Sequence, residues 1–397
     1  MPGFELFGDL ERNEVNHVLN TGVLMRYGFD GIRQGHWKAK ELETTLESTF
    51  QVNHAQLVSS GTAAISVALA VAGVGAGDEV ILPTFTFVAS FEAVMMLGAI
   101  PVLVDIDDTL TLCPNAVENA ITPKTKAIMV VHMCGSMGNM DALQTISNKH
   151  NLVLLEDACQ AIGATYKGKP LGSIGNLGCF SFDFVKTITC GEGGAVITNN
   201  KEYYINSDQF SDHGHDHIGS DRGAETHPYL GYNFRISELH AAVGLAQIKR
   251  LPEFLEIQKK NYTILREALS QIPEVTFRTV PEGGEENYSF LNFFLPSLEI
   301  TTKVSENFKQ NGVDACFHYY NNNWHYIRKW NHLKDLKSLF PISFEVKEGL
   351  EYLKTKTFQK SDDYIARNLS CLIKLSWTDE EVKQRAEKMV AIITHNL

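Results

Sequence analysis

The stretch that decides the fold is "NLVLLEDACQAIGATYKGKPLGSIGNLGCFSFDFVKTITCGEGGAVIT", residues 151–198. It contains one apolar run that ends at Asp157, then an aromatic, apolar run that ends at Lys186 before a glycine-rich turn. Near-continuous apolar runs are typical of strands that are covered on both faces of a parallel sheet. Ligands bind beside the carboxyl ends of such strands. The stretch therefore predicts an α/β sheet with Asp157 and Lys186 at adjacent strand ends.

The residues upstream repeat this alternation of strand and helix. Helical stretches at 61–74 and 86–98 interrupt a series of strand-like runs at 54–59, 77–83, 100–106, 127–133 and 151–157. Such alternation implies right-handed crossovers and a mostly parallel, doubly wound sheet. After about residue 250 the pattern changes to that of an α+β module. We expect an N-terminal arm and a large domain over residues 1–250, and a smaller C-terminal domain over residues 251–397.

The overall composition is that of a globular protein. The chain has 397 residues, of which 44% are hydrophobic and 21% are charged, values that argue against disorder. A net charge of −12 argues against a nucleic-acid-binding protein, which usually has a basic surface. Glu92 and Pro101 interrupt the longest apolar stretch, residues 85–106, so we expect no membrane span.

The first residues and the cysteines indicate a cytoplasmic protein. The opening "MPGFELFGDLERNEV" has acidic residues where a signal peptide needs a basic segment and an apolar core. Seven cysteines occur without any C-x-x-C pair. We therefore expect reduced thiols, with neither a disulfide framework nor a zinc site.

A turn between a strand and an Ala-rich helix is a candidate anion site. The sequence Ser59-Ser60-Gly61-Thr62-Ala63 combines free helix N–H groups with hydroxyl donors, which suits a phosphate. An ordinary Ser/Thr helix cap is the alternative interpretation. Phe87, in "PTFTFVAS", is either a ring that stacks on a flat cofactor or a core residue.

Lys186 and Asp157 are the candidate catalytic pair. Phe182 and Phe184 would disfavour the ammonium form of Lys186, which would leave the free amine that nucleophilic catalysis needs. A lysine that extends from a strand end into solvent is the alternative. Asp157 is either a ligand-binding carboxylate or a turn residue, and Gln160 follows at a distance that suits the same pocket.

The loop "SDHGHDHIGSDRG", residues 211–223, is rich in histidine and aspartate. Its spacing matches no standard zinc pattern. We therefore expect no metal and interpret the loop as a polar, partly cationic segment of the active site.

The order of these features points to one cofactor. An anion cup, an aromatic ring, a strand-end aspartate and a lysine match the phosphate, ring, ring nitrogen and aldehyde of pyridoxal 5'-phosphate (PLP). The sequence therefore predicts a PLP enzyme.

Ordered blocks along nearly the whole chain resemble the DegT/DnrJ/EryC1/StrS family of PLP-dependent sugar aminotransferases. They include "SSGTAAISVAL", "GAGDEVILPTFTFVAS", "ITPKTKAIMVVHMCG", the stretch 154–200 and "GYNFRISELHAAVGLAQI". The resemblance implies fold type I, as in aspartate aminotransferase. It also implies that Lys186 binds the cofactor aldehyde and that Asp157 pairs with the pyridine nitrogen.

The same resemblance implies roles for other residues. Thr62, Ala63 and Ser181, with the turn at Gly61, would hold the phosphate; Phe87 would stack on the ring, and Gln160 would contact the region of the ring hydroxyl. Asn233, in "GYNFR", would reach the phosphate of a neighbouring subunit, which implies a homodimer with shared active sites. Some family members are dehydratases with histidine in place of the lysine. Lys186 therefore favours transamination.

A narrower resemblance concerns the substrate. "MPGFELFG", "FSDHGHDHIGSDRGAE", "NNWHY" and "LIKLSWTD" are similar to aminotransferases that form 8-amino-3,8-dideoxy-D-manno-octulosonate (8-amino-Kdo) for lipopolysaccharide. It implies L-glutamate as donor, an acidic sugar aldehyde as acceptor, and a partner dehydrogenase that makes the aldehyde. A nucleotide-linked keto-sugar is the alternative acceptor. Candidate groups for the substrate carboxylate are Arg26, Arg33, Lys38, His213, His215, Arg222 and His325.

Overall fold

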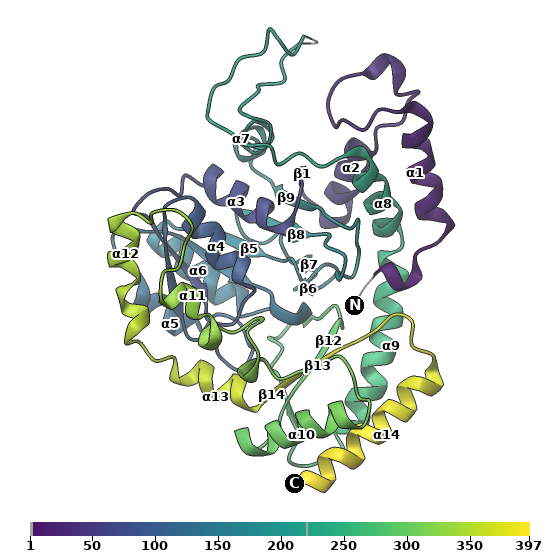
Figure 1. The fold of residues 1–397 in the computed structure, drawn as a ribbon, viewed down its shortest axis with the longest axis vertical. Helices are drawn as coiled ribbons and strands as arrows, with labels where there is room; N and C mark the ends of the chain where they lie inside the picture. The colour runs from purple at the N-terminus through teal and green to yellow at the C-terminus, as the bar shows by residue number, and fades with distance from the viewer. Residues whose placement is uncertain (1–2, 220) are drawn as a thin grey trace.

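A seven-stranded sheet forms the centre of the molecule in the computed structural model, which describes residues 3–219 and 221–397 (Figure 1). The strand order is β1-β9-β8-β5-β4-β2-β3. Its strands are β1 (His54–Val58), β2 (Glu79–Pro83), β3 (Ile100–Val104), β4 (Thr125–Val131), β5 (Val153–Asp157), β8 (Leu177–Ser181) and β9 (Gly194–Thr198). Pairing is parallel from β8 to β3, whereas β9 is antiparallel to both of its neighbours. The five predicted strands between residues 54 and 157 and the mostly parallel sheet are confirmed.

Both faces of this sheet are buried, which explains the continuous apolar runs. Along β4, Met129 belongs to the core on one face, while Ile128 and Val130 belong to the core on the other. The helices that accompany the sheet are α2 (Lys38–Phe50), α3 (Gly61–Val71), α4 (Val88–Met96), α5 (Pro114–Ala120), α6 (Met140–His150), α7 (Lys201–Ser211) and α8 (Glu238–Lys249). The arrangement is the predicted doubly wound one.

A second, four-stranded sheet lies in the C-terminal part of the chain (Figure 1). Its antiparallel strands, in the order β10-β12-β14-β13, are Thr276–Phe277, Phe290–Phe294, Asn368–Leu372 and Cys316–Phe317. Its accompanying helices are α9 (Leu251–Leu269), α10 (Leu298–Gln310), α13 (Gln359–Arg367) and α14 (Asp379–Asn396). This is an α+β arrangement, and we propose that the boundary of this smaller domain lies at the start of α9.

The remaining elements are short or lie near the N-terminus. Helix α1 (Asp9–Thr21) packs against α8, and α11 (Asn331–Lys334) and α12 (Phe344–Leu350) lie in the long segment before α13. A small three-stranded sheet consists of β6 (Thr165–Tyr166), β7 (Lys169–Pro170) and β11 (Gly284–Glu285). Over the described ranges, none of the helices combines the length and the apolar character that crossing a bilayer requires.

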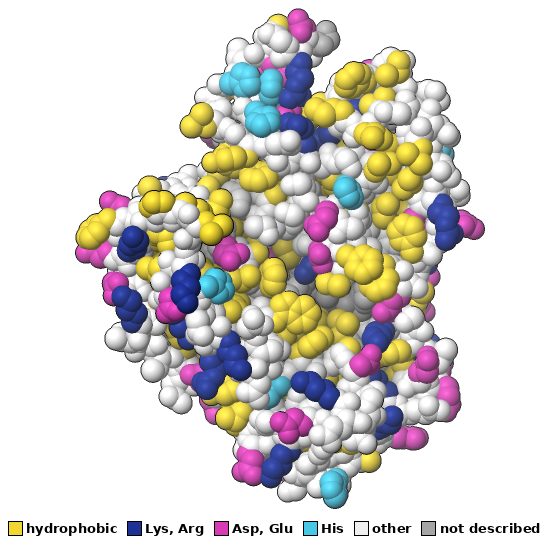
Figure 2. Space-filling model, in the orientation of Figure 1, with side chains coloured by type: hydrophobic (Ala, Val, Ile, Leu, Met, Phe, Trp, Pro, Cys, Tyr) yellow, Lys and Arg dark blue, Asp and Glu magenta, His cyan; other side chains and the backbone are white. Residues whose placement is uncertain are grey.

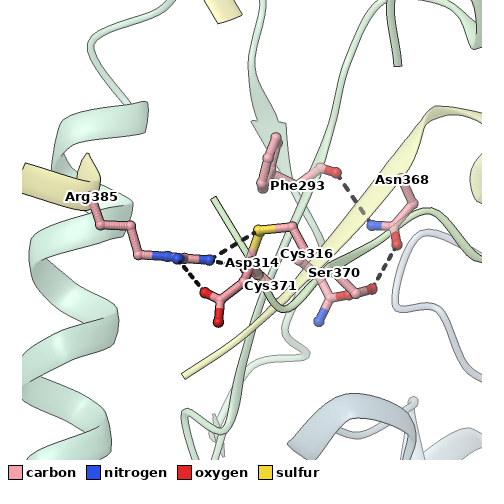
Figure 3. Close-up of a disulfide and its surroundings, with 8 residues drawn as sticks. Phe293, Asp314, Cys316, Asn368, Ser370, Cys371 and Arg385 are labelled. Carbon is pink, nitrogen blue, oxygen red and sulfur yellow. Dashed lines mark hydrogen bonds and ion pairs between the residues drawn. A yellow bond between two sulfur atoms is a disulfide. The ribbon is translucent and has the colours of Figure 1, made fainter. Parts of the chain in front are cut away.

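The prediction that all cysteines are reduced is wrong for one pair. Cys316 and Cys371 form a disulfide (Figure 3). The two residues are separated by 55 positions in the chain, but strand pairing between β13 and β14 places them directly opposite each other. Sequence spacing gave no sign of this proximity because it depends on the register of the small sheet.

The prediction that Lys186 ends a strand is also wrong. Strand β8 ends at Ser181, and the Lys186 amide N–H donates to the Asp183 carbonyl (3.0 Å) within a turn. Phe184 and Val185 are exposed rather than buried in the sheet. The apolar pattern continued past the strand because these residues face a cavity instead of the core.

Candidate active site

A cavity of about 760 Å³ lies where the two sheets meet. Its lining includes eight residues that the sequence singled out: Gly61, Thr62, Phe87, Asp157, Gln160, Ser181, Lys186 and His325. They come from strand ends, helix starts and loops that are far apart in the chain. The carboxyl ends of β5 and β8 open onto the cavity, as expected for a ligand site in a parallel sheet.

Lys186 enters the cavity from the turn after β8. Both backbone polar groups of Lys186 form hydrogen bonds: its N–H donates to the Asp183 carbonyl, and its carbonyl accepts from the Gly3 amide (2.9 Å). Phe4, from the same N-terminal segment, stacks on Phe184 with ring centroids 4.2 Å apart. The Lys186 ammonium makes no hydrogen bond or ion pair within the described ranges. The protein thus holds the lysine in place and leaves its amine available.

Asp157 is held by neutral donors instead of a cation. Its side chain is buried, and Ser90 Oγ donates to Asp157 Oδ2 (2.7 Å) while the Cys159 amide donates to Oδ1 (3.2 Å). Ser90 is on α4, so β5 and α4 together orient the carboxylate. Burial and the negative charge of Asp157 raise the pKa of Cys159 well above its usual value, which keeps that thiol neutral.

The start of helix α3 carries the residues of the predicted anion site. Ser60 is the N-cap, and the Ala63 amide donates to Ser60 Oγ (3.0 Å), so the cap interpretation is confirmed. Ala63 is buried and is not among the described residues that line the cavity, so its contact with a phosphate stays a prediction. A Cβ atom at Gly61 would lie 2.6 Å from Ser181 Cβ. Only glycine therefore allows this turn to approach Ser181 closely.

Aromatic side chains form one wall of the cavity. Phe87 is 42% exposed, and its ring meets the His325 ring edge-on at 5.5 Å. His325 also contacts Tyr319 and stacks on Trp324. Burial, together with the charge of Lys186, lowers the pKa of His325 to about 3, so this imidazole is neutral at physiological pH. Its buried Nδ1 has no hydrogen-bond partner among the described residues.

Gln160 is positioned by the loop after β4. The Cys134 amide donates to Gln160 Oε1 (3.0 Å). Cys134 has a left-handed backbone (φ 56°), which turns its N–H toward this acceptor. With Oε1 occupied, the Gln160 NH₂ group remains available to a ligand in the cavity.

The other residues that the sequence nominated lie outside the cavity of this chain. Asn233 is exposed and pairs with Asp212 in an isolated β-bridge. The cationic candidates form internal ion pairs: Arg26 with Glu43 (2.5 Å), Arg33 with Glu238 (3.4 Å), Lys38 with Glu14 (2.9 Å), His215 with Glu225 (2.8 Å) and Arg222 with Asp212 (2.8 Å). The His213 carbonyl accepts from His227. The contact of Asn233 with the phosphate of a neighbouring subunit and the substrate contacts of these six residues stay predictions.

The histidine-rich loop is an ion-pair network centred on Asp212. Its carboxylate, which is fully buried, pairs with His217 (2.9 Å), Arg222 and Arg235. Burial alone would raise the pKa of Asp212, but these partners hold it well below its usual value. Burial alone would lower the pKa of His217, but Asp208 and Asp212 raise it to about 9. Figure 2 shows histidine and basic side chains gathered on this upper loop.

Several lining residues were not predicted. Ser90 and His132 come from the large domain, and Trp324 and Lys374 come from the C-terminal part. His132 Nε2 lies 2.9 Å from Glu156 Oε2, and its buried Nδ1 is without a hydrogen-bond partner in the described ranges. The short spacing from Phe87 to Ser90 was an available signal, because residues three apart share a helix face. Trp324 and Lys374 lie in the blocks "NNWHY" and "LIKLSWTD" that carry the narrower resemblance, but nothing in those blocks singled out either residue.

The residues present fit PLP. The turn at Gly61 and Thr62 would hold a phosphate, and Phe87 offers an exposed ring. Among the described residues, Asp157 has no cationic partner and the Lys186 amine has no hydrogen-bond partner. The space that a Cβ at Gly61 would occupy is taken by Ser181, so the turn lies close to the Ser181 hydroxyl, a second donor for a phosphate. The volume is in the range of small-ligand pockets.

Comparisons with known proteins agree with this geometry. The DegT/DnrJ/EryC1/StrS aminotransferase family profile matches residues 8–389. 3-Amino-5-hydroxybenzoate synthase from Amycolatopsis mediterranei is 39% identical over 72% of this chain and 70% of its own length. GDP-perosamine synthase from Caulobacter vibrioides is 40% identical over 55% of this chain and 58% of its own length. A Streptococcus pneumoniae protein, described as a sugar aminotransferase and solved in its PLP form, superposes with a TM-score of 0.83, 25% identity, and coverage of 98% and 97% of the two chains.

Proposed function

Because the chain belongs to the DegT/DnrJ/EryC1/StrS aminotransferase family, we propose that it transfers an amino group from L-glutamate to the C8 aldehyde of oxidised Kdo, which gives 8-amino-Kdo. The protein is a PLP-dependent aminotransferase of fold type I. The observation that carries the assignment of chemistry is the meeting of Lys186, Asp157 and the Gly61–Thr62 turn in one cavity.

We propose the following roles in the reaction for the residues of this chain. PLP, when bound, carries the amino group between the two substrates and stabilises negative charge at the reacting carbon. We assign proton transfer at that carbon to Lys186 Nζ, which removes a proton from the donor and returns one to the product. The Asp157 carboxylate holds a proton at the ring nitrogen, and Ser90 and the Cys159 amide keep that carboxylate oriented.

The remaining roles concern binding. Backbone N–H groups at Gly61 and Thr62, with the Ser181 hydroxyl, would hold the phosphate. Phe87 would pack against the cofactor ring, and the Gln160 NH₂ group would donate to its hydroxyl region. The aromatic wall around His325 excludes water from the reacting atoms. These roles are the ones that the family resemblance implies, and the residues that would carry them line the cavity.

We also propose a homodimer in which Asn233 of each chain completes the neighbouring cavity. Figure 2 shows hydrophobic side chains over α1 and the segment after it, where Leu10, Leu19, Phe29 and Ile32 are each more than half exposed. A large exposed apolar patch is typical of a protein interface. We place the enzyme in the cytoplasm, supplied with its aldehyde by a dehydrogenase that acts on Kdo.

The substrate assignment is tested by coupled turnover of the purified holoenzyme. Oxidised Kdo and a panel of nucleotide-linked keto-sugars are supplied with L-glutamate, and formation of 2-oxoglutarate is measured. We expect the highest kcat/KM with oxidised Kdo. Preference for a nucleotide sugar would replace Kdo by the alternative acceptor, which the similarity to GDP-perosamine synthase favours, and would leave the aminotransferase chemistry intact.

A further inference from the structure

The small sheet supplies one wall of the cavity. Phe290 and Leu372 lie on its central strands, Phe317 lies on its edge strand, and Lys374 follows β14. We call these four residues, together with Trp324, the small-sheet wall. The groups assigned to chemistry, Asp157, Ser181 and Lys186, instead come from the large sheet and the turn after it. The small-sheet wall therefore faces the part of a substrate that does not react.

Lys374 gives this wall a positive charge. In the described part of the chain, Lys374 and Lys186 are the lysine or arginine residues that line the cavity. The other charged lining residues are acids, namely Glu5, Asp157, Asp183 and Glu192. A substrate carboxylate is repelled by these groups and attracted to Lys374. Because Lys186 is assigned to the reacting carbon, Lys374 is the lysine of this lining that is left to attract a carboxylate elsewhere on the acceptor.

The ammonium group of Lys374 is held in place but retains donors. Its Nζ lies 2.5 Å from Asp314 Oδ2, and its side chain is 27% exposed. Arg385 also binds Asp314 (2.9 Å), and Arg385 and Asp314 lie beside the Cys316–Cys371 disulfide (Figure 3). A lysine ammonium has three N–H donors, and Asp314 is its one hydrogen-bond partner in the described ranges. Two donors remain for a ligand.

Trp324 supplies a flat apolar surface in the same wall. Its side chain is 43% exposed, it stacks on His325 (5.0 Å), and it meets Phe317 edge-on (5.3 Å). These contacts fix the indole, so little side-chain entropy is lost when a ligand packs on it. An aromatic face and a cation that line the same cavity suit a sugar ring that carries a carboxylate.

We infer that Lys374 binds the carboxylate of the acceptor and that Trp324 packs against its sugar ring, an inference that rests on the acidic acceptor of the proposed function. Both are specificity-determining residues. L-Glutamate also carries a second carboxylate away from its reacting carbon, so the test measures the donor half-reaction separately from the acceptor.

The test compares Lys374→Met with the wild-type holoenzyme on oxidised Kdo and on the same sugar with its carboxylate converted to an amide. A charge-assisted hydrogen bond is lost, so KM for the acidic sugar should rise by about tenfold to a hundredfold. The KM for the amide, kcat, and the spectral titration of the donor half-reaction with L-glutamate should change less than about twofold. Lys374→Arg should restore most of the affinity for the acidic sugar.

Two further variants complete the experiment. Lys260→Met removes another ion-paired lysine, the partner of Asp379, from a site outside the cavity lining, and it should leave all four measurements unchanged. Trp324→Leu should raise KM for the acidic sugar and the amide by the same factor, because the ring is common to both.

Specific outcomes overturn the inference. If Lys374→Met raises KM equally for the acid and the amide, or weakens L-glutamate instead of the acceptor, Lys374 does not bind the acceptor carboxylate. If the wild type turns over Kdo aldehyde and Lys374→Met is unchanged, the inference alone fails. If the wild type rejects the acidic sugar but aminates a neutral or nucleotide sugar, both the proposed acceptor and this inference fail.

Discussion

The cavity and the histidine-rich loop are both recognisable in the sequence as groups of polar residues, but their charged side chains differ in how many ion-pair partners they have. In the cavity, Lys186 makes no ion pair in the described ranges, and Asp157 accepts hydrogen bonds from neutral donors. In the loop, Asp212 is surrounded by His217, Arg222 and Arg235.

The difference separates a site from a structural network. A buried or half-buried charge that lacks a partner costs stability, so it persists where a ligand uses it. A charged side chain with several oppositely charged partners in the same chain contributes to the folded structure and is less available to a ligand. Cavity substitutions should therefore lower activity and leave stability unchanged or higher, whereas substitutions of Asp212 and His217 in the loop should lower stability. The predictions below test this contrast.

The largest expected effect comes from Lys186→Ala. It removes the amine that we assign to cofactor binding and proton transfer, so turnover should fall by more than about 10⁴-fold. The absorbance band of lysine-bound PLP should disappear as well. The thermal midpoint of the variant without cofactor should equal or exceed that of the wild type without cofactor, because no ion pair is lost. A variant that keeps both the band and the turnover would remove Lys186 from the mechanism.

Asp157→Asn should have the next largest effect. The amide has the shape of the carboxylate but cannot hold a proton at the cofactor's ring nitrogen by charge, so kcat should fall by about 10²- to 10³-fold. Ser90→Ala, which removes the 2.7 Å hydrogen bond to Oδ2, should cost about tenfold. Steady-state kinetics of both holoenzymes provide the measurement. A larger loss for Ser90→Ala than for Asp157→Asn contradicts the view that Ser90 acts through Asp157.

Asp212→Asn sharpens the other side of the comparison. It leaves Arg222, Arg235 and His217 without their shared acceptor, so the free energy of unfolding should fall by about 3 kcal/mol. Chemical unfolding at pH 7 is the measurement. Glu299→Gln is the matched control, because the Glu299–Lys303 pair is exposed and should contribute less than about 0.5 kcal/mol. Equal losses in the two variants would contradict the structural role of the network.

The sequence could predict the chemical part of the site because local pattern positions it. Asp157 ends a buried strand and Gly61 begins a helix, and parallel strands bring such positions to one edge of a sheet. The sequence predicted Lys186 at the end of a strand, but the strand ends at Ser181 and Lys186 lies in the turn that follows. The turn still places Lys186 in the lining of the cavity, which is what its proposed role requires.

The specificity-determining part could not be predicted in the same way. Lys374 and Trp324 reach the cavity only because the small sheet packs against the large one, and nothing in their local sequence encodes that contact. The arginines show the converse problem. Arg26 and Arg33 have the right charge for a carboxylate substrate, but both are buried beside Glu43 and Glu238 and neither is among the described residues that line the cavity. Residue type alone does not distinguish a ligand-binding cation from a structural one.

The smallest effect we predict is a pH-dependent loss of stability in His217→Gln. The pKa of His217 is raised from an ordinary value near 6.5 to about 9 in the folded protein. Its charged form therefore stabilises the fold fully below about pH 6.5, and this contribution disappears as the pH rises through 9. The wild type should unfold with about 2 kcal/mol more free energy than the variant at pH 6, and the two should converge near pH 10. His332→Gln, which alters an exposed histidine 3.8 Å from Glu92, is the control and should stay close to the wild type at every pH. If the His217→Gln difference were constant from pH 6 to pH 10, packing rather than charge would hold the loop, and the contrast between paired and unpaired charges would lose its basis there.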